Sequence, residues 1–260
     1  RNGSGRPASA ASTIRCCGSD GIRRRGTGGL TRGDRRTLQE WEAVVDLRSD
    51  AAGAEDSLAR HFRTVATHRL IVLGGPGSGK SMVLVRIVLD LLGARRSGEA
   101  VPVLLSLSSW RPGGNGFRPW LIRQLAIEYP FLGASGAETL LAHSLVLPVL
   151  DGLDEMPAHL AGSALREIGD GLGQDGMIMA CRLEDYQRTL TGPVQKIDGA
   201  AAVVLEDLTP PVVKEYLTRN LSGAQAWAPV LAALDQDTPV ARVLRTPLMV
   251  TLARAVHGAG

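Results

Sequence analysis

The sequence predicts an α/β fold in which five short strands and intervening helices build a mostly parallel sheet covered by helices. Apolar runs of four to seven residues, rich in Val, Ile and Leu, recur at 70–73, 101–107, 145–150, 177–181 and 202–205. Stretches with helical spacing of apolar residues separate the first four runs. Two runs end in a chemically distinctive turn, one glycine-rich and one acidic. Binding residues of parallel sheets gather at such strand ends.

The first apolar run leads into a turn that matches the phosphate-loop pattern G-x-x-x-x-G-K-[ST]. The turn consists of Gly74, Gly75, Pro76, Gly77, Ser78, Gly79, Lys80 and Ser81. Its glycines allow the backbone to curl until successive N–H groups point at phosphate oxygens, and a helix beginning at Lys80 adds the positive end of its dipole. We expect Lys80 to reach the β- and γ-phosphates of a nucleotide and the Ser81 hydroxyl to hold Mg²⁺.

The run at 145–150 ends in an acidic turn with carboxylates at Asp151, Asp154 and Glu155. Pro148 removes a ladder donor and argues against a central strand, but the acidic end favours a strand whose carboxylates lie beside the phosphate loop. Asp151 is the candidate Mg²⁺ partner, through water. Glu155 is the candidate base that orients the attacking water, with Asp154 as the alternative. The competing interpretation is an acidic turn that only caps a helix at 157–172.

Arg182 follows the apolar run at 177–181. A cation at that strand end would face the γ-phosphate from the side opposite Lys80 and respond to its presence. The alternative is a surface ion pair between Arg182 and Glu184 or Asp185.

Composition and pattern divide the chain into four parts. Residues 1–36 predict a disordered basic leader, because they are rich in Gly, Ser and Arg and lack apolar periodicity. Residues 37–67 predict flanking helices, although 37–47 also fit a short strand. The α/β domain spans 68–207, and a helical domain begins at 208–210 with a staple, a cap and a first-turn proline. The chain starts without methionine and stops in a helical pattern, so we expect a longer protein.

Charge is distributed unevenly along the chain. Of the net charge of +3, residues 1–36 contribute +7 and the remainder contributes −4, so a nucleic-acid surface on the folded part has no support. A basic arm that contacts nucleic acid or anionic lipid, and a solvated leader, both fit residues 1–36. Three cysteines without a C-x-x-C pair fit a reducing cytosol, and there is no apolar run of 18 residues. We therefore expect a cytoplasmic segment without a membrane span, with any attachment lying outside it.

Taken together, these motifs resemble the NACHT NTPase domain of the STAND class of signalling ATPases and GTPases, and more closely NACHT proteins of high-GC actinobacteria. The resemblance covers about residues 60–257, and the doubled acidic pattern is its most specific mark. The similar stretches are G-G-P-G-S-G-K-S at 74–81, L-P-V-L-D-G-L-D-E-M-P at 147–157, M-I-M-A-C-R-L-E-D-Y at 177–186, E-D-L-T-P at 206–210 and T-P-L-M-V at 246–250.

The resemblance implies a five-stranded parallel sheet with the 177–181 strand between the phosphate-loop and Asp151 strands. It also implies that Arg182 is a sensor arginine and that Pro247 packs near the nucleotide base. Cys181 and Leu183 depart from the family, where Ser or Thr and Pro are usual.

The function implied by the resemblance is a switch with slow Mg²⁺-dependent ATP hydrolysis, used in bacterial defence or signalling. ADP would hold a closed monomer, and exchange for ATP would open it for self-association that activates an effector outside this segment. A DNA-directed AAA-type motor and a metabolic phosphotransferase are the alternatives. The residues alone do not distinguish ATP from GTP.

Overall fold

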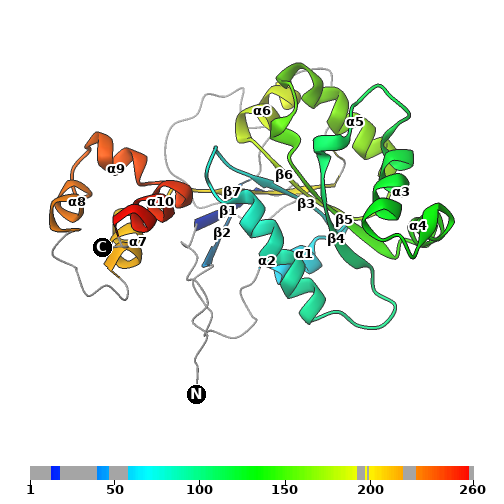
Figure 1. The fold of residues 1–260 in the computed structure, drawn as a ribbon, viewed down its shortest axis with the longest axis horizontal. Coiled ribbons are helices and arrows are strands. Elements are labelled where there is room, and N and C mark those ends of the chain that lie inside the picture. Colours follow the sequence, from blue (N-terminus) through cyan, green and yellow to red (C-terminus); the bar gives the residue numbers. More distant parts are fainter. Residues whose placement is uncertain are drawn as a thin grey trace.

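A computed structural model describes residues 13–17, 40–46, 58–191, 197, 199–218 and 227–257 (Figure 1). Its five predicted strands are confirmed and form the parallel part of one sheet. They are β3 (Arg69–Leu73), β4 (Val101–Ser106), β5 (Val146–Asp151), β6 (Met177–Cys181) and β7 (Ala201–Leu205). The sheet order is β2-β1-β7-β3-β6-β5-β4, so β6 lies between β3 and β5, as the resemblance implied. The carboxyl ends of β3, β6 and β5 therefore meet at one edge.

Two antiparallel strands extend this sheet beyond β7, and here the structure differs from the prediction. Strand β1 (Thr13–Cys17) pairs with β7 inside the segment predicted to be disordered. Strand β2 (Glu40–Asp46) pairs with β1 where flanking helices were preferred. An open sheet edge offers unpaired backbone groups to any nearby segment, which local composition does not reveal. The rest of the predicted leader lies outside the described residues.

Helices cover the sheet and continue beyond it. The α-helices are α1 (Leu58–Thr64), α2 (Lys80–Gly93), α3 (Phe117–Glu128), α4 (Gly133–Ala142), α5 (Ala161–Leu172), α6 (Leu183–Thr191), α7 (Pro210–Thr218), α8 (Ala228–Ala233), α9 (Pro239–Val243) and α10 (Pro247–His257). Helix α6 was not predicted, and Pro239 opens α9. The Thr238 hydroxyl caps α9 by accepting from the N–H of Ala241 at 3.1 Å.

Both faces of the sheet are buried, and the alternation along β3 separates two cores. Leu70 and Val72 pack with apolar residues of α1 and α2. Ile71 and Leu73 pack with apolar residues of α3, α4 and α5. Because successive side chains of a strand point to opposite faces, a continuous apolar run is what a two-sided sheet requires.

Pro148 lies inside β5 although it cannot donate to a ladder. Strand β5 pairs with β4 along its whole length, from Val146 to Asp151. Its register with β6 covers only Val149 opposite Ile178 and Leu150 opposite Met179, so this ladder begins after the proline. The strand is central, and the missing N–H is accommodated by a shortened pairing on one side.

Helices α7 to α10 lie together at one end of the molecule, to the left of the sheet in Figure 1. They share a separate apolar core that includes Leu208, Val213, Leu217 and Val250. The N–H of Leu208 donates to the carbonyl of Arg245 at 2.6 Å, which ties the entry of α7 to the turn before α10. Over the described residues, no helix is long and apolar enough to cross a membrane.

Candidate functional site

The glycine-rich turn between β3 and α2 has the curled backbone that the sequence predicted. Gly77 has φ of 70° and Gly79, directly before α2, has φ of 88°, a left-handed conformation that glycine adopts without steric cost. The N–H of Gly74 donates to the carbonyl of Cys181 at 3.3 Å, and the N–H of Ser78 donates to the carbonyl of Gly75 at 3.3 Å. The turn is therefore attached to the end of β6 as well as to β3.

Lys80 is buried under this turn, with 8% of its surface exposed. Its Nζ donates to the carbonyl oxygens of Gly74 at 3.2 Å and Gly75 at 3.0 Å. The same nitrogen lies 3.3 Å from Oδ2 of Asp154. Two carbonyls hold the ammonium in place without neutralising it, so its charge is directed at whatever anion occupies the remaining direction.

Asp154 joins the two predicted cations of the site. Its Oδ2 accepts from Nε of Arg182 at 3.2 Å and also lies against Lys80. The structure thus brings together Lys80 at the start of α2, Asp154 in the acidic turn after β5, and Arg182 between β6 and α6. The sequence predicted that both cations lie near the phosphates. Its alternative for Arg182 was an ion pair with Glu184 or Asp185, not with Asp154. The position of the Asp154 carboxylate between the two cations could not be predicted from the spacing of the acidic residues in the sequence.

Asp151 and Glu155 lie in the same acidic turn with different surroundings. Asp151 ends β5 opposite Ser106 at the end of β4, and its Oδ1 accepts from the N–H of Gly152 at 2.9 Å. Glu155 is exposed in a one-turn 3₁₀ helix, Leu153–Glu155. No side chain caps α5, which begins after Leu160, so the acidic residues do not serve as its cap.

A metal ion at this edge would need ligands beyond the protein. Ser81 is exposed at the start of α2, and Asp151 is half-buried at the end of β5. Within the part of the chain that the structure describes, no three His, Cys, Asp or Glu side chains are grouped to hold a metal. Hydroxyl and carboxylate oxygens suit Mg²⁺, which usually keeps several waters and is also bound by substrate phosphates. Ser81 and Asp151 therefore fit a site in which the protein supplies only part of the ligands of the ion.

The helical segment contacts the phosphate loop directly. The N–H of Leu248, the second residue of α10, donates to the carbonyl of Gly77 at 3.2 Å. A Cβ built on Gly77 would lie 3.2 Å from Cβ of Leu248. Pro247, predicted to pack near a nucleotide base, is half-buried at the first position of α10 and so lies next to this contact. The position of a base relative to Pro247 stays a prediction.

Cys181 ends β6 beside these charged groups but is itself inert. Burial is the main factor that raises the pKa of its thiol to about 12, and the negative charges of Asp185 and Asp154 add to the effect. Its Sγ donates to the carbonyl of Arg182 at 3.3 Å. The thiol is therefore uncharged at neutral pH and serves packing, not nucleophilic chemistry.

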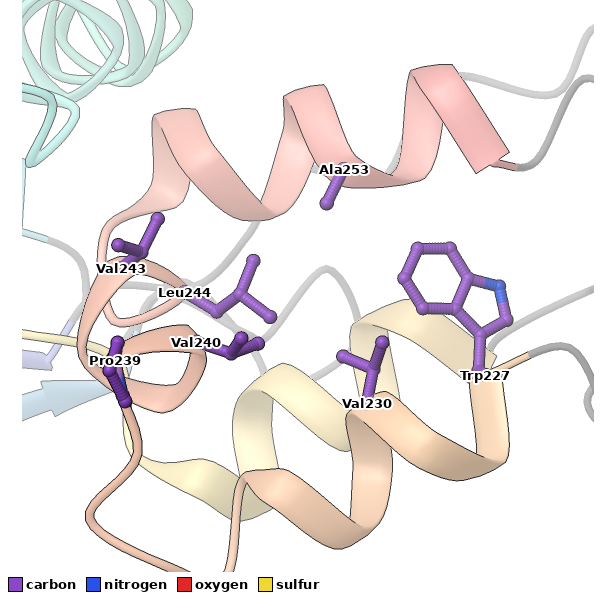
Figure 2. A pocket seen from close by; sticks show the side chains of 7 residues that line it. All are labelled: Trp227, Val230, Pro239, Val240, Val243, Leu244 and Ala253. Atoms are coloured by element: carbon purple, nitrogen blue, oxygen red, sulfur yellow. The ribbon is translucent and has the colours of Figure 1, made fainter.

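An apolar hollow of about 330 Å³ lies in the helical segment (Figure 2). It is lined by Trp227, Val230, Pro239, Val240, Val243, Leu244 and Ala253. None of these side chains is charged, and an anion gains no compensation there for lost hydration. The hollow is therefore suited to apolar groups and not to the phosphates that the glycine-rich turn would bind.

Gly77 provides a direct test of the contact between the loop and α10. We expect Gly77→Ala to lower the free energy of unfolding by about 1–2 kcal/mol, because its positive φ and the nearby Leu248 both disfavour a side chain. Gly75→Ala is the matched control. Its Cβ would meet no atom within 4 Å, and we expect a change below about 1 kcal/mol in urea unfolding. Equal losses in the two variants would contradict the contact.

The sheet order and the glycine-rich turn before α2 define a P-loop α/β fold. No family model matches the chain, and no curated protein matches it. Among solved structures, it is similar to AMPPCP-bound DnaA from Aquifex aeolicus, with 16% sequence identity and a TM-score of 0.41. The match covers 73% of this chain and 56% of that chain, so it spans only about half of the DnaA structure.

Proposed function

We propose that this chain binds a nucleoside triphosphate with Mg²⁺ at residues 74–81, hydrolyses it slowly and acts as a nucleotide-dependent switch. The observation that supports this most strongly is the position of Lys80. Its ammonium is held by the carbonyls of Gly74 and Gly75 at the edge of the sheet where Arg182 and the acidic turn also lie. A buried cation next to curled backbone amides is suited to phosphate oxygens.

The side chains divide the proposed chemistry among themselves. Lys80 would bind the β- and γ-phosphates, while Ser81 and Asp151 would hold Mg²⁺, which neutralises charge on the phosphate oxygens when it is bound. Glu155 is exposed next to the site and would orient the attacking water. Arg182 would stabilise negative charge on the terminal phosphate.

The contact between Leu248 and Gly77 supports the switch part of the proposal. A change in the loop on nucleotide exchange would alter the backbone hydrogen bond that anchors α10. The helical segment would then be released or held according to the nucleotide state, as expected for a two-state arrangement biased by a γ-phosphate. A switch of the NACHT and STAND type, cytoplasmic, with self-association in the ATP state and an effector outside this segment, is the form we propose.

A DNA-directed motor of the AAA type is the second candidate, favoured by one observation. The strand β6, inserted between β3 and β5, fits that class as well. DNA-stimulated hydrolysis with a steep salt dependence would favour the motor over the switch.

Titration calorimetry with Mg·ATP tests the proposal, followed by size-exclusion chromatography in ATP and in ADP. We expect binding below millimolar concentration, slow turnover, and a larger species in ATP than in ADP. Absence of heat at millimolar Mg·ATP would contradict nucleotide binding. Rapid phosphorylation of a small acceptor, with no change of oligomeric state, would contradict the switch and favour a phosphotransferase.

A further inference from the structure

Asp154 occupies the one position in the described site where two cations meet. Its Oδ2 lies 3.3 Å from Nζ of Lys80 and 3.2 Å from Nε of Arg182. The carboxylate is 15% exposed and Lys80 is 8% exposed, so water screens this contact only weakly. A single oxygen that pairs with an ammonium and accepts from a guanidinium is the arrangement that a phosphate oxygen would also require.

We propose that Asp154 sets the preference of the site between triphosphate and diphosphate, a proposal that rests on the proposed function. The carboxylate holds Lys80 and Arg182 together until a terminal phosphate displaces it. A diphosphate fills the loop and leaves the pair between Asp154 and Arg182 intact. A triphosphate brings a third phosphate to the two cations, and two anions cannot share them without strong repulsion. Because Lys80 would meet the β-phosphate of either nucleotide, the free energy that distinguishes the two nucleotides is that of breaking the pair between Asp154 and Arg182, which only the triphosphate requires.

The pairing also separates the roles of the neighbouring acids. A carboxylate held by two cations is not free to receive a proton from water, whereas Glu155 is exposed and one residue further along. Both residues belong to the single 3₁₀ turn Leu153–Glu155. The two carboxylates are therefore carried by one short segment of backbone, with Asp154 directed to the cations and Glu155 exposed to solvent.

The test measures dissociation constants for a non-hydrolysable ATP analogue and for ADP, both with Mg²⁺, by titration calorimetry on the full chain. We expect Asp154→Asn to tighten analogue binding about tenfold, because a charge-assisted pair no longer has to be broken. Binding of ADP should change less than about threefold. The ratio of the two constants therefore rises in favour of the triphosphate.

Asp235→Asn is the matched control. Asp235 forms an ion pair with Lys214 at 2.6 Å in the helical segment, away from the loop, and its loss should leave the ratio unchanged. If Asp154→Asn does not fold, Asp154→Ser gives the same comparison. An unchanged or reduced ratio in the Asp154 variant would overturn the inference. If the parental chain binds neither nucleotide, the proposed function fails instead, so the two failures are distinguishable.

Discussion

Lys80→Ala is expected to weaken binding of Mg·ATP by about 100-fold, equivalent to about 3 kcal/mol. The ammonium is the buried cation of the loop, already oriented by the carbonyls of Gly74 and Gly75, so little entropy is lost when a phosphate binds it. Arg182 is 44% exposed on the far side of Asp154 and cannot replace a charge beneath the turn. Titration calorimetry at fixed ionic strength measures the loss.

The chain provides a close control for this variant. Lys214 also pairs with an aspartate, Asp235 at 2.6 Å, but lies on α7 in the helical segment. We expect Lys214→Ala to bind Mg·ATP as the parental chain does. Lys80→Ala leaves Asp154 with one cation instead of two, so urea unfolding should be recorded for both variants. Binding of Mg·ATP by Lys80→Ala within about threefold of the parental chain would contradict the assignment of Lys80.

The central strands could be predicted from the sequence because burial on both faces requires a continuous run of apolar residues. Strands β3 and β6 are buried on both faces, so every position except Arg69 at the start of β3 is apolar, and the two runs stand out from their surroundings. The face of α2 that packs on the sheet likewise repeats Val83, Leu84 and Ile87 at helical spacing. The phosphate loop could be predicted because its glycines permit a curled backbone and its lysine supplies a cation for phosphate oxygens.

The remaining elements depend on partners far along the chain. Strand β1 exists through its pairing with β7, almost two hundred residues later, and its own composition suggested no structure. Helix α6 is short and follows Arg182 without a break, and its polar sequence, L-E-D-Y-Q-R-T-L-T, resembles a loop. Local spacing contains no information on such contacts.

The roles within the acidic turn show the same limit at the scale of one residue. Spacing placed Asp151, Asp154 and Glu155 near the phosphates but did not show which carboxylate would meet the cations. The left-handed Gly152, with φ of 86°, starts the 3₁₀ turn and so decides where the next side chains are directed. Asp154 is directed inward to Lys80 and Glu155 outward to solvent. That difference appears only in three dimensions.

Glu155→Gln is expected to slow hydrolysis of Mg·ATP by about 100-fold or more while binding stays within about threefold of the parental value. The amide keeps the shape of the side chain but cannot accept the proton of the attacking water. Glu155 makes no ion pair with another described residue, so the substitution leaves the contacts of Lys80 and Arg182 in place. Phosphate release under single-turnover conditions measures the step.

Glu138→Gln is the matched control, because Glu138 is exposed on α4, away from the loop, and should leave the rate unchanged. Hydrolysis by Glu155→Gln at the parental rate would mean that Asp154, or neither acid, is the base. Asp154→Asn decides between these outcomes. If Asp154 only restrains the two cations, its loss leaves chemistry intact once the triphosphate is bound, whereas a basic role for Asp154 makes hydrolysis fall while binding persists. The two variants together therefore assign one carboxylate to selection of the nucleotide and the other to activation of water.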